Sequence, residues 1–366
     1  MMSAAARRTH SVYEMGFSIS SLLVSTVAAN EARLLSCVAG LPRCIGVPDL
    51  ASGKAWGCNL VNITTVDGGS EVVSVGPSPQ QVQVACSGQN MTNFTARDGT
   101  PVTFSLPVAM DSVKAEYFQW VMSDGTSRTA ECAIPNGGPA NEGNEQETIA
   151  IIGDAGGWGD VSLVAMEIVG PLMLIASNGS RVSAEGLRYD GPSLVWENGA
   201  TLLSARLEEF STVGEGVVNP LGAYPNHCRQ LFPSTTHRVR LLWNGGVSLD
   251  GQRPITPDRT DLFVLKDGDA ALAAVAVLGL ADLGKLPAPP PEALHERDTY
   301  ASDGDNYLDV CLSLDGVAPP TVVEVVCGPG TQISLPKGLD SPHGGYVPRA
   351  PALCVPHAVN VSEGAP

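Results

Sequence analysis

Short apolar runs that alternate with turn sequences constrain the fold of this chain more than any other feature. The runs at residues 60–66, 71–75 and 102–107 are rich in Val and Thr, and each is too short for an ordinary helix. Glycine and proline, with 40 and 28 of the 366 residues, supply the turns between such runs. This pattern is typical of antiparallel strands joined by tight turns, and it excludes a coiled coil, a helical solenoid and a collagen.

Two hairpins are predicted from their turns. Asp124-Gly125 separates strand-like residues 117–122 from residues 127–132, and an Asp-Gly pair supplies the positive φ angle of a two-residue turn. A second hairpin is predicted for residues 307–314 and 321–326, which flank a Gly- and Pro-containing turn. Residues 81–86 and 148–152 are predicted to be further strands, because they are short and rich in branched side chains.

One strand and two helices carry more specific expectations. In residues 237–243, His237, Arg238 and Arg240 alternate with Val and Leu, which predicts a strand with one solvent-facing and one buried face. Residues 201–210 can place four apolar side chains on one side of a helix. The Ala and Leu content of residues 269–283 also favours a helix, with a buried pair of strands as the alternative.

These segments predict an all-β fold with a minor helical part: an antiparallel β-sandwich, immunoglobulin-like or jelly-roll-like. A parallel α/β sheet would need alternating helices, which the pattern lacks. The length is about twice that of a usual domain, so two β domains are expected. Residues 134–147 lack apolar periodicity and are predicted to form a linker or long loop, which separates an N-terminal β domain (30–133) from a C-terminal β-rich domain (148–366).

The N-terminal segment has the layout of a secretory signal peptide. Arg7 and Arg8 precede an apolar stretch at residues 16–29 that ends in small residues, which predicts removal of residues 1–29. A plain disordered or helical N-terminus is the alternative. Beyond this segment no apolar stretch reaches about 18 residues, so no integral membrane span is expected.

The nine cysteines lie beyond this segment and form no Cys-x-x-Cys pair; they are Cys37, Cys44, Cys58, Cys86, Cys132, Cys228, Cys311, Cys327 and Cys354. Scattered cysteines of this kind predict disulfides formed in an oxidising compartment, with buried reduced thiols as the alternative. Sequence alone leaves the connectivity open. One pairing has a geometric argument, because Cys311 and Cys327 could face each other across the second predicted hairpin.

Five Asn-x-Ser/Thr sequons are candidate glycosylation sites: Asn62, Asn90, Asn93, Asn178 and Asn360. Asn178 lies in a turn sequence and is the best candidate, whereas Asn62 lies in an apolar run and is the least exposed candidate. Asn90 and Asn93 are close enough for one glycan to hinder the other. Together with the signal layout and the cysteines, the sequons predict a secreted or cell-surface protein.

A candidate calcium site is formed by Asp303, Asp305 and Asp309, whose carboxylates lie at relative positions 1, 3 and 7. Hard oxygen ligands in this arrangement can surround a calcium ion, although the segment lacks the Gly and the final Glu of an EF-hand loop. The alternative is a turn in which the Asp and Asn side chains cap local amide groups.

No motif identifies a reaction. The Gly-rich loop at residues 153–160 contains Trp158 and two acids, Asp154 and Asp160, whose negative charges would repel phosphate. No nucleophile elbow or zinc-protease motif occurs. Glu197, Glu208 and Glu209 could supply a carboxylate pair for glycoside hydrolysis, but the separation that this reaction requires is set by the fold, and exposed acids are abundant in so acidic a chain.

The net charge of −17 opposes binding to nucleic acid. The predicted function is therefore a structural or binding role, calcium-assisted, toward an unidentified protein or carbohydrate partner. The alternative is an extracellular hydrolase whose catalytic groups come together only in the fold.

Overall fold

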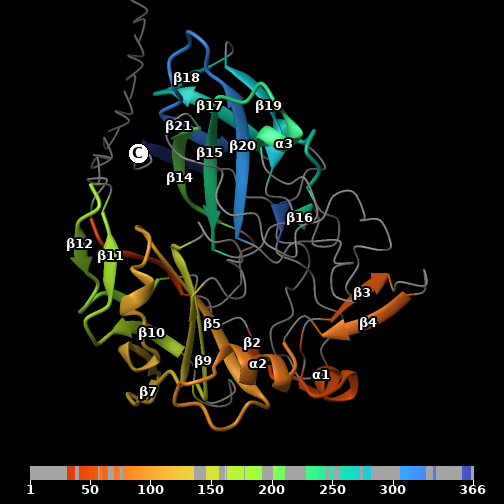
Figure 1. Cartoon of the computed structure of the whole chain (residues 1–366), viewed down its shortest axis with the longest axis vertical. Coiled ribbons are helices and arrows are strands. Elements are labelled where there is room, and N and C mark those ends of the chain that lie inside the picture. Colours follow the sequence, from red (N-terminus) through yellow and green to blue (C-terminus); the bar gives the residue numbers. More distant parts are fainter. Residues whose placement is uncertain are drawn as a thin grey trace, which may run out of the picture.

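The structure is a computed structural model, in which strands dominate and three short α-helices are described (Figure 1). It describes residues 31–37, 41–56, 58, 60–64, 70–74, 77–135, 146–155, 161, 163–176, 178–191, 201–210, 228–244, 248–249, 255–272, 275–281, 306–326, 333–334 and 357–363. The predicted signal segment, most of the predicted linker, Trp158, Asp160 and Glu197 lie outside these residues.

Two antiparallel sheets make up most of the N-terminal half. In the first, the strands follow the order β1-β5-β9-β8, and β2 also pairs with β5. Their bounds are β1 Leu34–Cys37, β2 Leu41–Ile45, β5 Arg97–Phe104, β8 Cys132–Pro135 and β9 Thr148–Gly153. The second sheet has the order β13-β10-β6-β7, with β6 Phe118–Met122, β7 Ser127–Thr129, β10 Leu163–Ile168 and β13 Arg188–Tyr189.

The first hydrophobic core collects side chains from both of these sheets. Val102 and Phe104 of β5 and Ile149 of β9 share it with Trp120 of β6 and Met166 of β10, and all five are fully buried. The predicted β6–β7 hairpin is confirmed, with Gly125 at a φ of 81° in its turn. Since β9 pairs with both β5 and β8, this sheet runs across the boundary predicted at residues 134–147.

Smaller elements complete the N-terminal half. The strands β3 Leu60–Thr64 and β4 Ser70–Ser74 form a hairpin, as do β11 Met173–Ile175 and β12 Arg181–Ser183. The helices are α1 Leu50–Trp56 and α2 Pro79–Ala85, and single 3-10 turns occupy Met110–Ser112 and Ala115–Tyr117.

The strand predicted at residues 81–86 is wrong, because this segment belongs to α2. Pro79 occupies the start of the helix, where its missing N–H costs nothing. The backbone N–H of Ser78 donates to the side chain of Gln81 at 2.8 Å, which is half of a capping box. The alternation of Val82 and Val84 suggested a strand, but only Val82 is buried and Val84 is 78% exposed.

The C-terminal half is built on a curled eight-stranded sheet with the order β18-β17-β21-β23-β14-β15-β20-β19 (Figure 1). Its strands are β14 Leu202–Glu209, β15 His237–Trp243, β17 Phe263–Asp267, β18 Ala270–Ala271, β19 Ala276–Ala281, β20 Tyr307–Ser313, β21 Val322–Val325 and β23 His357–Glu363. The pairing of β14 with β23 is parallel, and every other pairing between described strands is antiparallel.

A second hydrophobic core lies on one face of this sheet and includes Val239, Leu241, Trp243, Leu308 and Val310. The remaining elements are the helix α3 Cys228–Leu231, the 3-10 turn Thr260–Leu262, and the strand pair β16 Ser248–Leu249 and β22 Ile333–Ser334.

Three expectations for the C-terminal half need correction. The helix predicted at residues 201–210 is the strand β14, whose cross-strand pairs with β15 prevail over local helical spacing. Residues 269–283 contain β18 and β19 instead of a helix, as in the alternative of strands, but the two strands do not pair with each other and β18 is exposed. The hairpin predicted from residues 307–314 and 321–326 is also wrong, because β20 pairs with β15 and β19, whereas β21 pairs with β17 and β23.

Candidate functional site

The central strands of the eight-stranded sheet carry charged side chains on the face opposite the second core. On β15, Val239 and Leu241 belong to that core, whereas Arg238 and Arg240 point to the other face, as the alternation of a strand requires. The prediction that this other face is open to solvent is wrong, because Arg238 is 2% and Arg240 3% exposed. Such burial of arginine requires compensating charges.

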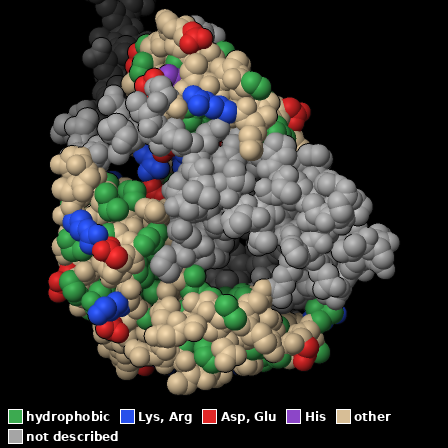
Figure 2. All heavy atoms as spheres, viewed as in Figure 1, with side chains coloured by type: hydrophobic (Ala, Val, Ile, Leu, Met, Phe, Trp, Pro, Cys, Tyr) green, Lys and Arg blue, Asp and Glu red, His purple; other side chains and the backbone are tan. Residues whose placement is uncertain are grey.

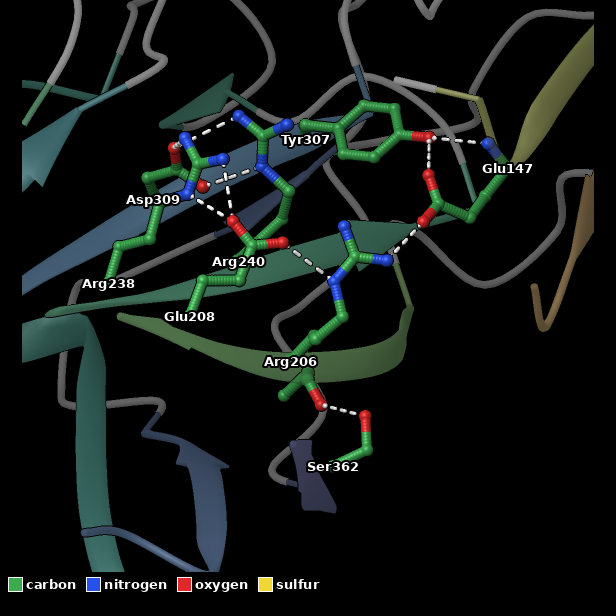
Figure 3. A network of polar contacts seen from close by, with 9 residues as sticks. Glu147, Arg206, Glu208, Arg238, Arg240, Tyr307, Asp309 and Ser362 are labelled. Atoms are coloured by element: carbon green, nitrogen blue, oxygen red, sulfur yellow. Dashed lines mark hydrogen bonds and ion pairs between the residues drawn. The ribbon is translucent and has the colours of Figure 1, made fainter. Parts of the chain in front are cut away.

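Asp309 supplies the first compensating charge (Figure 3). It lies on β20 directly opposite Arg240. Its Oδ1 accepts a hydrogen bond from Arg240 Nε at 2.9 Å, and its Oδ2 accepts bonds from Arg240 Nη2 at 3.0 Å and from Arg238 Nη1 at 2.8 Å. Both oxygens of this carboxylate are therefore occupied by guanidinium groups.

Glu208 supplies the second compensating charge. It lies on β14, opposite Arg238 of β15. Its Oε2 accepts a hydrogen bond from Arg238 Nε at 2.6 Å, and its Oε1 accepts one from Arg206 Nε at 2.7 Å. Glu208 thus joins two arginines that belong to neighbouring strands, and the cluster continues along β14 to Arg206 (Figure 3).

Glu147 supplies the third compensating charge. It lies immediately before β9. Its carboxylate forms an ion pair with Arg206 and accepts a hydrogen bond from the Tyr307 hydroxyl at 2.9 Å. The ring of Tyr307 also lies 5.3 Å from the guanidinium of Arg240. We call these seven residues the buried charge network: Glu147, Arg206, Glu208, Arg238, Arg240, Tyr307 and Asp309.

The buried charge network connects the N-terminal sheets to the C-terminal sheet. Besides Glu147 and Tyr307, Asn306 donates to the Thr148 hydroxyl at 3.1 Å and to the Trp243 carbonyl at 2.9 Å. Leu35 of β1 packs against Leu242 and Tyr307. Charged, polar and apolar contacts therefore hold β1 and β9 against the start of β20.

The network contains three arginines and three carboxylates, so its formal charges balance. Burial by itself would raise the pKa of Glu208. The positive charges of Arg206 and Arg238 lower this pKa by more than burial raises it, so the resulting pKa lies below the usual range. The same opposition between burial and the two arginines, Arg238 and Arg240, leaves the pKa of Asp309 lowered. Both groups are ionised at neutral pH, which suits a structural role better than proton donation.

The lowered pKa values predict acid destabilisation. In the unfolded chain these carboxylates bind protons near pH 4, above the pH at which the folded chain binds them. Their stabilisation is therefore complete above about pH 5 and is lost as the pH falls through about 4 towards the folded-state values. Urea unfolding midpoints measured from pH 6 to pH 3 at low ionic strength should fall over this range.

Salt distinguishes the network from exposed ion pairs. About 1 M salt screens exposed charges strongly and buried charges much less. The loss of stability at acidic pH should therefore persist in about 1 M salt. An acid dependence that disappears at high salt would assign the effect to surface groups. Arg181 with Asp111 and Arg188 with Glu167 are such exposed pairs.

On the described surface in Figure 2, basic side chains lie beside acidic ones, without a large patch of one sign.

Of the predicted calcium ligands, Asp309 lies in the buried charge network, whereas Asp303 and Asp305 lie outside the described residues. Within the described residues no group of three or more His, Cys, Asp or Glu side chains is arranged to hold a metal ion. Calcium binding stays a prediction. In the Gly-rich loop, Oδ1 of Asp154 lies 3.7 Å from Nη1 of Arg128.

The predicted use of cysteines in disulfides is confirmed for six of them. Cys44 bonds to Cys58, Cys86 to Cys132 and Cys228 to Cys311. The predicted pairing of Cys311 with Cys327 is therefore wrong; β20 and β21 are not neighbours, and α3 brings Cys228 to Cys311 instead. Cys37 is a buried free thiol whose pKa burial raises, and Cys327 and Cys354 lie outside the described residues.

Four of the five sequons have described side chains. Asn90, Asn93, Asn178 and Asn360 are exposed, and Asn62 lies in β3 with a side chain that is not described. Their glycosylation stays a prediction.

Sequence reasoning did not identify the buried charge network. Glu147 fell in the predicted linker, Glu208 in a predicted helix, and Asp309 in a predicted metal site. One signal was present, because Arg238 and Arg240 alternate with apolar residues in a chain with only 21 Lys and Arg.

No protein-family model, curated protein or solved structure significantly matches this chain. Within the described residues, no helix has both the length and the apolar character needed to cross a membrane.

Proposed function

We propose that this chain is a secreted or cell-surface protein with a structural or binding role, stabilised by disulfides. The observation that carries the proposal is the set of three disulfides, whose six cysteines are at most 2% exposed. Buried bridges distributed over both halves are typical of proteins that mature in an oxidising compartment. Their burial also favours permanent structural bonds over exchange with other thiols.

The buried charge network supports a structural or binding role. Its carboxylates already accept hydrogen bonds from arginines, and the network holds the two halves together. A rigid junction of this kind suits a protein that presents a fixed surface to a protein or carbohydrate partner. The proposal includes an immunoglobulin-like or jelly-roll-like sandwich fold. The hydrophobic core that the two N-terminal sheets share supports this part.

Asp309 is not available as a calcium ligand in this structure, because its carboxylate oxygens accept hydrogen bonds from Arg238 and Arg240. A calcium ion would depend on Asp303 and Asp305 with backbone carbonyls and water. Calorimetric titration of the mature protein with calcium tests this part separately.

Secretion is tested by expressing the full chain in eukaryotic cells with its own N-terminus. The expected product appears in the medium, begins after residue 29, and shows the three disulfides on non-reducing peptide mapping. Exchange of residues 1–29 for the signal peptide of a known secreted protein provides the matched control. Retention of Met1 inside the cell, with the six cysteines alkylated when the protein is unfolded without a reductant, would contradict the proposal.

A further inference from the structure

The hairpin formed by β11 and β12 carries a sequon at its tip. Met173 pairs with Ser183 and Ile175 with Arg181, and the chain reverses between them. Gly179 has a φ of 77°, and a Cβ atom added to it would meet nothing within 4 Å. Asn178 and Ser180 are exposed on either side of it. The hairpin lies at the periphery of the molecule in Figure 1, so the sequon is presented to solvent.

The side chain of Asn178 is oriented by the turn itself. Its Oδ1 accepts a hydrogen bond from the backbone N–H of Ser180 at 2.9 Å. The amide nitrogen Nδ2, the atom that an N-glycan modifies, makes no hydrogen bond to any described residue. Modification at Nδ2 would therefore leave this turn bond and the strand pairing in place.

The other described sequons are tied more closely to the fold. Asn93 has a similar turn bond to Thr95, but a Cβ added to Gly46 would lie 1.7 Å from the carbonyl oxygen of the intervening Phe94, which shows how closely this backbone packs. In the sequon of Asn90, the middle residue Met91 is buried.

The sequon of Asn360 lies within β23, which pairs with β21 on one side and β14 on the other. A glycan there would be attached to an exposed side chain of a strand whose backbone is paired on both sides. Asn62 lies within β3, paired with β4. By comparison, Asn178 lies in the exposed, hydrogen-bonded turn between β11 and β12.

We propose that Asn178 is the preferred N-glycan acceptor of this chain, an inference that rests on the proposed entry into the secretory compartment. In the reaction, Asn178 Nδ2 forms a bond to the anomeric carbon of an oligosaccharide carried on a lipid pyrophosphate. The bond between that carbon and the pyrophosphate oxygen breaks, the lipid pyrophosphate leaves, and the amide gives up one proton to solvent. No oxidation or reduction takes place.

The test is translation of the full chain with microsomes that carry out N-glycosylation. One version keeps the native residues 1–29, and a second replaces them with the signal peptide of a known secreted protein. The protease-protected product is treated with a glycan-releasing amidase in heavy-oxygen water, and mass spectrometry locates the labelled position. Label that also appears without the amidase is subtracted, because the Asn178-Gly179 pair can deamidate spontaneously. The expected result is a label at residue 178 in most protected molecules, and a lower occupancy at each other sequon.

Two substitutions at Ser180 form a matched pair. Ser180→Ala keeps the backbone N–H that bonds to Asn178 but destroys the sequon, so the label at residue 178 should be lost. Ser180→Thr keeps the sequon, and the label should remain. This pair tests the sequon while the turn hydrogen bond stays in place. Asn178→Gln alone would remove the acceptor and the turn hydrogen bond together.

The two signal versions distinguish the two proposals. Protected product that carries no label at residue 178, or a higher occupancy at another sequon, overturns the glycan inference and leaves secretion standing. Failure of the native version to become protected, with a label at residue 178 in the exchanged version, overturns secretion and supports Asn178 as the acceptor.

Discussion

Replacement of Asp309 by asparagine is expected to lower the free energy of unfolding by about 3–5 kcal/mol, because buried Arg240 loses the carboxylate that compensates its charge and Arg238 keeps only Glu208. Asp309 is 2% exposed, and both its oxygens accept hydrogen bonds from Arg238 and Arg240. Asparagine has nearly the same shape, so the loss reports charge and hydrogen bonding more than packing. Guanidinium unfolding at pH 7 provides the measurement.

A double-mutant cycle identifies the cause. Arg240→Met combined with Asp309→Asn removes one charge of each sign, so the pair should cost clearly less than the sum of the two single changes. Additivity within about 0.5 kcal/mol would show that the two residues do not act as a pair. Asp111→Asn is the surface control: its partner Arg181 is exposed, and the unfolding midpoint should hardly change.

Removal of the Cys228–Cys311 disulfide, by replacing both cysteines with alanine, is expected to cost about 2–5 kcal/mol. This bridge closes the longest of the three described loops, with a separation of 83 residues. It also fixes α3 beside Phe210 and Ala281, next to Arg238, whose guanidinium lies 5.5 Å from the Phe210 ring. The loss should appear as a lower guanidinium midpoint under non-reducing conditions.

The two other bridges serve as matched controls. The separations of Cys44–Cys58 and Cys86–Cys132 are 14 and 46 residues. Loop-closure entropy alone makes the longest bridge more stabilising than the shortest by roughly 1.5 kcal/mol. An equal or larger loss on removal of Cys44–Cys58 would contradict a stabilisation set by loop length.

Local turn chemistry and strand length made much of the fold predictable. The Asp124-Gly125 turn placed the β6–β7 hairpin, and the short Val- and Thr-rich runs indicated β3 and β4. The errors arose where tertiary pairing prevailed over local pattern. Residues 201–210 have helical spacing but form β14, and the two halves of the predicted C-terminal hairpin each pair with strands distant in sequence.

The buried charge network was harder to predict because its meaning depends on neighbours. Charged residues that alternate along a strand usually face solvent, and this expectation misplaced Arg238 and Arg240. Only the strand order brings Glu208 and Asp309 to either side of them. Glu147 comes from a segment with no strand pattern, so its contact with Tyr307 was not visible in the sequence.

The position of β23 has a consequence for the order in which the chain assembles during synthesis. This last described strand lies between β21 and β14 in the eight-stranded sheet. Before it leaves the ribosome, no pairing between the other described strands joins β18, β17 and β21 to β14, β15, β20 and β19. The N-terminal half can fold as it emerges. In the other half the two groups of strands can pack against their common core, but each keeps an open edge until β23 arrives to join them.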